Sequence, residues 1–247
     1  MYITIKALVL RITDYNDKDA LINVLTAEHG LLTLKARGLR RKNSPLTGCC
    51  QLLAYSEFTL FEYKGAYSIN EGRPLELFLN LRSDLQKLSL GTYFAQVAQV
   101  VAQEDTPSPD LLSLLLNCLH GLSQTDIPER QIKGVFELRC VCIAGFLPDL
   151  SGCHVCGEPH PDRIDISNGV LVCSRCRGLG NDGLRLPVSA GVLQALRYLV
   201  DCDSKAILRF RLSEESVENF SRITEAYLST QLERGFSALD FYKSLFV

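Results

Sequence analysis

Hydrophobic and polar positions alternate along the first 80 residues with the two-residue period of β-strands. The opening run is the clearest, because Ile3, Ile5, Ala7 and Val9 occupy every second position. Four similar runs follow, at residues 19–26, 31–36, 51–63 and 66–70. Five strands in so short a stretch, with a long polar segment between the third and the fourth, predict a small barrel. The OB-fold is the commonest five-stranded barrel that binds nucleic acid, although the pattern alone leaves an SH3-like barrel open.

From residue 81 onward, apolar side chains recur at the three- and four-residue spacing of amphipathic helices. The stretch that begins at Ser83 and ends at Gln86 has the form of a capping box, and Pro109 suits the first position of a second helix. Further helices are predicted at residues 128–144, 189–200 and 213–234. The sequence therefore predicts an α+β multidomain protein. It comprises an OB-fold domain at residues 1–80 and a helical domain at 81–247, with an insertion at about 150–184.

Four cysteines occupy that insertion at a spacing that suits a metal ion. Cys153 and Cys156 are two residues apart, as are Cys173 and Cys176, and sixteen residues separate the pairs. A two-residue gap lets both thiolates of a pair reach one ion from a tight turn, and the second turn completes the tetrahedron of a zinc ribbon. We expect one structural Zn²⁺ per chain, with no open position for catalysis. A lost metal and redox chemistry are the alternatives, although no βαβ pattern accompanies the Cys-x-x-Cys pairs.

The overall composition is ordinary for a soluble globular protein, with 47% hydrophobic and 22% charged residues in a chain of 247. Ten cysteines would suit a disulfide scaffold, but four belong to the metal site and others, such as Cys118, lie in apolar helical patterns. The first strand carries Lys6 and Arg11, so it is no signal peptide, and no apolar run is long enough to span a bilayer. These features predict a cytoplasmic protein that is not bound to a membrane.

The formal net charge is only −2, so any attraction to nucleic acid must come from a local patch. Residues 29–56 supply one, because they contain no acidic side chain. Five cations fall within eight positions there: Lys35, Arg37, Arg40, Arg41 and Lys42. Cations on a strand end and the loop after it would neutralise phosphates, which needs no recognition of bases. We expect these five residues to bind DNA; the alternative is a solvated charged loop.

Aromatic residues of the predicted barrel are candidates for stacking against bases. They are Tyr2, Tyr55, Phe58, Phe61 and Tyr67. Because successive side chains of a strand point to opposite faces, about half of these rings should lie in the barrel core. For any single ring, a place in the core is therefore the favoured interpretation.

Catalytic motifs are absent from the sequence, which has no phosphate loop, no Gly-x-Ser-x-Gly and no His-Glu-x-x-His. Asp14, Asp17 and Asp19 are close enough in sequence to suggest a metal-dependent nuclease, but a loop that caps backbone amides explains them equally well. We therefore expect no enzymatic activity and a protein that binds nucleic acid.

Ordered sequence blocks run through most of the chain. They are KALVLR at 6–11, Asp14-Tyr15 and Asp19, LTAEHG at 25–30, ARGLRR at 36–41 with Ser44 and Leu46, FELR at 136–139, GFLP at 145–148, and the four cysteines with Gly169-Val170-Leu171 before the second pair. Together they resemble the RecO family of bacterial DNA repair and recombination mediators. The resemblance is thin beyond residue 185.

The resemblance implies an N-terminal OB-fold followed by a helical domain that carries a zinc ribbon. It also implies binding of single- and double-stranded DNA, annealing of complementary strands, and help in loading RecA onto DNA coated by single-strand-binding protein. RecR and the acidic C-terminal tail of single-strand-binding protein are the implied partners, with RecA an indirect one. The five cations match the family's DNA-binding strand and loop.

The family's groove for that acidic tail does not map cleanly onto this chain. Three cations of the predicted helix at 128–144 are candidates: Arg130, Lys133 and Arg139. Helical periodicity places Arg130 and Lys133 on one face and Arg139 on another. An ion pair of Arg139 with a local acid such as Glu137 or Asp149 is the alternative interpretation.

Two other classes of function compete with a mediator. One is a regulator whose zinc ribbon reads a DNA sequence, but the ribbon's arginines are balanced by acids, which leaves little net field. The residues concerned are Arg163, Arg175, Arg177 and Arg185 against Glu158, Asp162, Asp165 and Asp182. The other is an enzyme that processes nucleic acid, for which turnover in the presence of a divalent metal would be diagnostic.

Overall fold

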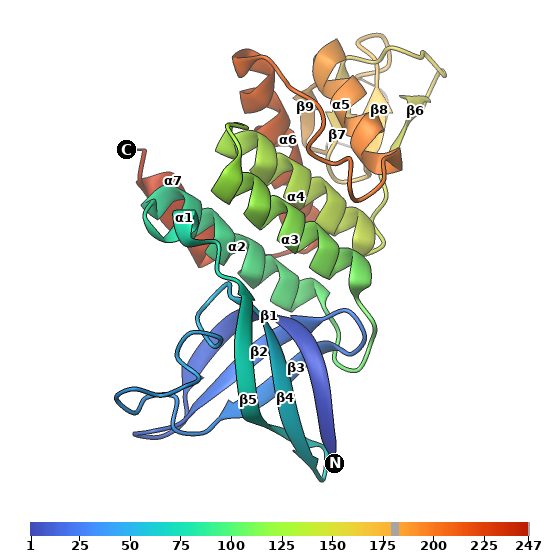
Figure 1. Cartoon of the computed structure of the whole chain (residues 1–247). Coiled ribbons are helices and arrows are strands. Elements are labelled where there is room, and N and C mark those ends of the chain that lie inside the picture. Colours follow the sequence, from blue (N-terminus) through green and yellow to red (C-terminus); the bar gives the residue numbers. More distant parts are fainter. Residues whose placement is uncertain (179–182, 247) are drawn as a thin grey trace. The chain divides into compact units, whose positions relative to one another are not determined.

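The computed structural model describes residues 1–178 and 183–246, so residues 179–182 of the predicted ribbon, Asp182 among them, lie outside the described residues (Figure 1). Contacts within the chain divide it into two compact units. The first unit joins Met1–Ser123 to the segment from Phe236 onward, and the second is Gln124–Gly235. The boundary predicted at residue 80 marks a change from strands to helices inside the first unit. No helix among the described residues is long and apolar enough to cross a membrane.

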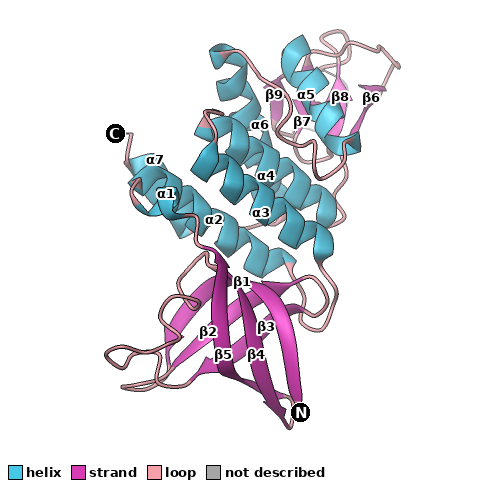
Figure 2. Ribbon diagram, in the orientation of Figure 1, coloured by secondary structure: helices cyan, strands magenta, loops and turns pink. Residues whose placement is uncertain are grey.

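Five strands of the first unit close into a barrel (Figure 2). They are β1 (Tyr2–Asp14), β2 (Ala20–Thr26), β3 (Gly30–Ala36), β4 (Tyr55–Tyr63) and β5 (Ala66–Glu76). Their order is β1-β2-β3-β5-β4, and β1 pairs with both β2 and β4. Neighbouring strands are antiparallel except β3 and β5, which run parallel. This is an OB-like barrel, so the predicted fold is confirmed.

The barrel core is built from the inward side chains of these strands and from the loop between β3 and β4. The inward set on β1 and β4 is Ile5, Ala7, Val9, Phe58 and Leu60. The loop at residues 37–54 adds Leu46, Cys49 and Cys50 to the same cluster. The Ser56 hydroxyl donates to the Cys49 carbonyl at 2.8 Å. The loop that carries most of the predicted DNA-binding cations is therefore anchored in the core, and the adjacent cysteines serve its packing.

Four helices complete the first unit: α1 (Leu79–Arg82), α2 (Leu85–Val101), α3 (Pro109–Gln124) and α7 (Ser237–Ser244). The N-terminus of α2 is capped by Asp84, whose carboxylate accepts from the backbone N–H groups of Gln86 and Lys87. The predicted capping box is therefore wrong by one residue, because the Ser83 hydroxyl donates instead to a carbonyl of α1.

The described part of the second unit contains three helices and a four-stranded sheet. Its elements are α4 (Glu129–Ile143), β6 (Asp149–Cys153), β7 (Arg163–Asp165), β8 (Val170–Val172), β9 (Arg185–Pro187), α5 (Ala190–Asp201) and α6 (Glu214–Gln231). The sheet has the order β6-β8-β7-β9 and lies between α4 and α5 in the sequence, as predicted for the ribbon. Helices α4 and α6 approach closely at Gly134, where a Cβ atom would lie 2.4 Å from the Phe220 ring.

Gly30, at the start of β3, is required for two separate reasons. Its φ is +62°, and a Cβ atom would lie 2.3 Å from the Thr106 carbonyl oxygen and 2.4 Å from that of Gln103. Gly65 in the β4–β5 turn has φ +76° but nothing within 4 Å. We expect Gly30→Ala to lower the free energy of unfolding by about 2–5 kcal/mol, because backbone strain and overpacking add. Gly65→Ala should lose only the strain component, about 1–2 kcal/mol. Chemical denaturation measures both, and equal losses would contradict the steric argument.

Candidate nucleic-acid interface and metal site

The five predicted DNA-binding cations lie together at one end of β3. Lys35 is on the strand itself and half-buried, whereas the four that follow, at positions 37, 40, 41 and 42, are exposed on the loop. The β1–β2 loop holds their backbone in place. The Gly38 N–H donates to the Asp19 carboxylate at 2.9 Å, and the Arg40 N–H donates to the Lys18 carbonyl at 3.1 Å. We call these five residues the basic cluster.

Two acids from the β1–β2 region meet the basic cluster, although residues 29–56 contain no acidic side chain of their own. Asp14 forms an ion pair with Arg40, and Asp19 lies 3.8 Å from the Lys35 ammonium group. The Gly38 N–H and the Asn16 side chain hold the pKa of Asp19 below its usual value, so it is ionised at neutral pH. These acids are distant in sequence from residues 29–56, which is why the pattern of charges along the chain did not reveal them.

The remaining three cations leave the basic cluster positive. Arg37, Arg41 and Lys42 are exposed, and none forms an ion pair with any residue that the structure describes. Five cations and two acids give a local charge of 5 − 2 = +3. These three cations are available to bind phosphate, whereas Asp14 and Asp19 hold Arg40, Lys35 and the loop backbone in position. Their ion pairs with the cluster speak against the nuclease interpretation of these carboxylates.

The five candidate stacking residues differ in their burial. Phe58 is fully buried, and Tyr55 and Tyr67 are partly buried. Only Tyr2 and Phe61 are exposed, at 62% and 41%, and their ring centroids are 5.4 Å apart.

Two exposed tyrosines were not anticipated from the sequence. Tyr63, two residues beyond Phe61 on the same face of β4, is 62% exposed. Tyr15 is also exposed, and the Lys35 ammonium group lies 4.5 Å from the centre of its ring. The two-residue period of β4 could have identified Tyr63, whereas the position of Tyr15 depends on the path of a loop.

The four predicted metal ligands converge in the second unit. Cys153 ends β6 and Cys156 lies in the following turn, while Cys173 and Cys176 belong to the turn after β8. All four sulfur atoms lie within 4.8 Å of one another, and those of Cys156 and Cys173 are 3.6 Å apart. A tetrahedral ion with bonds of about 2.3 Å needs sulfur atoms separated by about 3.8 Å, so the cage fits one ion.

Backbone N–H groups favour the thiolate form of Cys153, which is the form that binds a metal cation. Although burial raises it, the N–H groups of residues 173, 156 and 155 lower the pKa of Cys153 to about 6. Both turns are closed by backbone bonds, from Gly157 N–H to the Cys153 carbonyl at 2.8 Å and from Cys176 N–H to the Cys173 carbonyl at 3.0 Å. Four protein ligands complete a tetrahedron, so a metal held here would have no free position for a substrate.

Ion pairs within the ribbon neutralise part of its positive charge. Arg175 pairs with Glu158 at 3.0 Å, and Arg185 pairs with Asp165 at 3.4 Å. These contacts agree with the balance of charges expected from the sequence.

The three candidate partner-binding cations of α4 do not form one surface. Arg130 is exposed and pairs with Glu218 of α6. Lys133 is 2% exposed, so it cannot contact a partner in this structure. The Arg139 guanidinium donates to the carbonyls of Leu199 and Val200 in α5, at 2.8 and 3.2 Å, rather than to either of the acids considered above. The helical period placed these residues around α4 but did not reveal that α5 and α6 cover the helix.

Lys133 belongs to a buried charged network between α4 and α6. Its ammonium group lies 2.9 Å from a carboxylate oxygen of Glu137 and 2.9 Å from one of Glu225. Burial lowers the pKa of Lys133, but the two carboxylates outweigh it and raise the pKa above 10.5. Burial also raises the pKa of Glu137.

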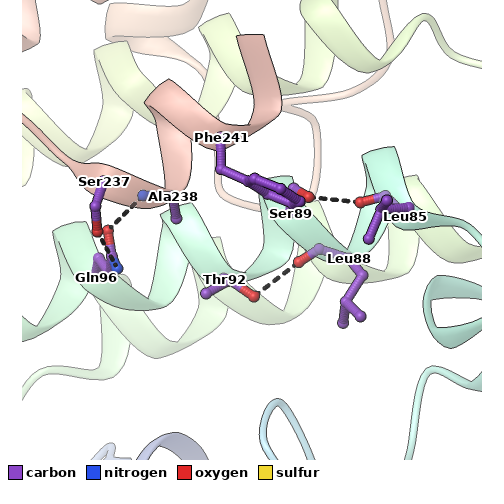
Figure 3. Close-up of a pocket in the computed structure, with 8 residues that line it drawn as sticks. All are labelled: Leu85, Leu88, Ser89, Thr92, Gln96, Ser237, Ala238 and Phe241. Carbon is purple, nitrogen blue, oxygen red and sulfur yellow. Dashed lines mark hydrogen bonds between the residues drawn. The ribbon is translucent and has the colours of Figure 1, made fainter. Parts of the chain in front are cut away.

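An apolar groove of about 370 Å³ lies between α2 and α7 in the first unit (Figure 3). Leu85 and Phe241, which are half-exposed, line it together with Leu88. The hydroxyl of Ser89 donates within α2 to the Leu85 carbonyl at 2.6 Å, so its proton is already used in a hydrogen bond inside the helix. The sequence did not predict the groove, because α7 returns to the first unit from the far end of the chain.

Comparison with known proteins assigns both parts of the chain to one family. A family model described as the N-terminal part of recombination protein O matches residues 1–78, and one described as its C-terminal part matches residues 82–240. A protein called DNA repair protein RecO from Acetivibrio thermocellus is 32% identical over 246 residues, which cover 99% of this chain and 97% of that protein. Another of that name, from Alkaliphilus metalliredigens, is 28% identical over 248 residues, or 99% of this chain and 100% of that protein.

Proposed function

This chain belongs to the RecO family of DNA repair proteins, and we propose that it acts as a recombination mediator. In this role it binds single- and double-stranded DNA, anneals complementary strands, and assists the loading of RecA onto DNA coated by single-strand-binding protein. The single observation that carries the proposal is the basic cluster on an OB-like barrel. It acts by binding and positioning strands in the cytoplasm, without turnover of the DNA.

The geometry of the basic cluster supports contacts to phosphate rather than to bases. Its exposed cations lie on a loop whose backbone is anchored by Leu46 and by a hydrogen bond from the Gly38 N–H to Asp19, so little backbone entropy is lost when a strand binds. Each cation that meets a phosphate releases counterions, and this gain is the same for every sequence. A mediator that must act at any break needs this kind of contact.

We further propose that the four-cysteine cage holds one structural Zn²⁺ per chain. Four thiolates at tetrahedral distances are the ligands that zinc takes in ribbons, whereas calcium and magnesium prefer oxygen. The ion would stabilise the fold of the ribbon and would take no part in chemistry on DNA.

RecR and the acidic tail of single-strand-binding protein are the proposed partners, with RecA an indirect one. An acidic and apolar tail needs an exposed cation beside an apolar surface. Of the three candidates on α4, Arg130 alone keeps an exposed charge, and we retain it for this role. Titration of a labelled tail peptide against Arg130→Ala tests the assignment, which predicts weaker peptide binding with unchanged affinity for free DNA.

Charge reversal in the basic cluster tests the proposed function. The triple variant Arg37→Glu, Arg41→Glu and Lys42→Glu should bind single- and double-stranded DNA at least about 10-fold more weakly at low salt, and annealing should fall with it. The slope of log affinity against log salt should decrease by about 2 for single strands, which corresponds to three lost phosphate contacts at about 0.7 each.

A matched control reverses three exposed cations of the second unit, Lys205, Arg209 and Arg222. The net charge changes equally in both variants, so only a local role separates them. Fluorescence anisotropy over a salt series measures affinity and slope. Equal losses in the two variants, or a loss confined to one DNA sequence, would contradict the proposal.

A further inference from the structure

An outward-facing row of side chains crosses four strands of the barrel and ends at the basic cluster. The strand register pairs Tyr2 of β1 with Phe61 of β4, Phe61 with Ser68 of β5, and Ser68 with Lys35 of β3. Residues paired across neighbouring strands point to the same face. The exposure of Tyr2 and Phe61 identifies this face as the outer one.

The geometry of the row suits one extended strand of nucleic acid. Neighbouring strands are about 4.8 Å apart, so the backbone of Phe61 lies about 10 Å from that of Lys35. Ser68 lies between them, and its small side chain does not obstruct a strand that passes from one to the other. Tyr63 shares the face of Phe61, and the Lys64 ammonium group lies 5.4 Å from the centre of its ring. We call Tyr2, Phe61 and Tyr63 the aromatic step.

The charges around the aromatic step restrict the path of an anion. On the next outward row, Thr4 pairs with Thr59, and Thr59 pairs with the exposed Glu71. The carboxylate of Glu71 therefore repels a polyanion on one side of the row of Tyr2, Phe61, Ser68 and Lys35. On the other side, beside Tyr63, the Lys64 ammonium group attracts it. Charge complementarity thus directs a strand along the row that carries the exposed rings.

We propose that the aromatic step stacks the unpaired bases of a single strand whose phosphates contact the basic cluster. The inference rests on the proposed DNA binding and adds a subsite that is selective for single strands. Aromatic rings accept any base, because every base has a π-face, so the subsite has no sequence preference. In a duplex the bases are already stacked inside the helix and cannot reach the rings.

This subsite would make the protein bind the unpaired strands more tightly than the annealed duplex. Two unpaired strands gain both the phosphate contacts and the stacking, whereas the duplex product retains only the phosphate contacts. Pairing of the strands therefore weakens their hold on the barrel and favours release of the product.

The first test uses a fluorescent reporter at the subsite. The chain contains no tryptophan, so Phe61→Trp introduces a single indole into the aromatic step. An oligothymidine strand should quench its fluorescence, whereas an abasic strand of the same length and a duplex should not. Phe241→Trp on α7 provides a control indole of similar exposure outside the row, and its fluorescence should not respond.

The second test removes the rings. The double variant Tyr2→Thr and Phe61→Thr keeps β-forming residues and should bind oligothymidine about 5-fold or more weakly, with no change for duplex, abasic strand or salt slope. Phe61→Trp alone should retain full affinity, which separates stacking from a folding defect. Equal losses on single strands and duplex, or unchanged binding of oligothymidine, would overturn the subsite while the charge-reversal result for the basic cluster stands. Wild-type protein that binds no DNA at all would overturn the proposed function as well.

Discussion

Replacing Cys173 with serine is expected to unfold the ribbon of β6–β9 and to abolish stoichiometric zinc binding. The buried cluster around the cage is small, because it consists of Val172 and three of the cysteines. Strands β7, β8 and β9 have three residues each, too few to be stable alone. A structural zinc site contributes on the order of 10 kcal/mol to the folding of such a module. Loss of one ligand should therefore exceed the effect of any ordinary core substitution.

Elemental analysis and thermal unfolding measure this result together. Wild-type protein should carry one zinc per chain, and Cys173→Ser should carry none and should unfold at a lower temperature. Cys202→Ser is a suitable control, because Cys202 is a partly buried cysteine outside the cage. DNA binding by the barrel should survive in any soluble fraction of the Cys173 variant. A variant that keeps wild-type stability, or a wild-type protein without zinc, would refute the structural role.

Local patterns predicted the barrel and the ribbon well. The two-residue alternation of Ile5, Ala7 and Val9 follows from closure of the barrel, which turns this face of β1 toward the core, and this burial leaves a direct trace in the sequence. The cysteine spacing was equally informative, because both ligands of each pair lie on one tight turn. In each case, the signal is carried by residues that are close to one another in sequence.

Contacts between distant segments were not predictable in the same way. Asp14 and Asp19 reach the basic cluster because the β1–β2 loop folds toward the loop after β3, and no local pattern encodes that approach. The α2–α7 groove depends on the return of the last helix to the first unit. The spacing of Lys133 and Glu137 allows an ion pair at i, i+4, but only the packing of α6 against α4 makes the pair a buried one.

Replacing Lys133 with methionine is expected to lower the free energy of unfolding by about 3–5 kcal/mol, because it removes the positive charge that balances Glu137 in the protein interior. Methionine keeps a long unbranched side chain, so the change removes charge more than volume. The Lys133 ammonium group also donates to the Ser221 hydroxyl at 3.2 Å, and this bond is lost with it. Arg130→Met is the matched control on the same helix. Its ion pair with Glu218 is exposed, so the loss should be at most about 1 kcal/mol.

The dependence of this loss on pH identifies its cause. Burial already raises the pKa of Glu137 above 4.5, and removal of the ammonium group should raise it further. A carboxyl group with a raised pKa binds its proton more tightly in the folded chain than in the unfolded one. It therefore lowers stability progressively as the pH rises from about 4.5 through the folded pKa. The deficit of Lys133→Met should accordingly be smaller in mildly acidic than in mildly alkaline buffer, and adding Glu137→Gln should recover part of it. A deficit that does not change with pH, or that Arg130→Met reproduces, would show that the buried charge is not its source.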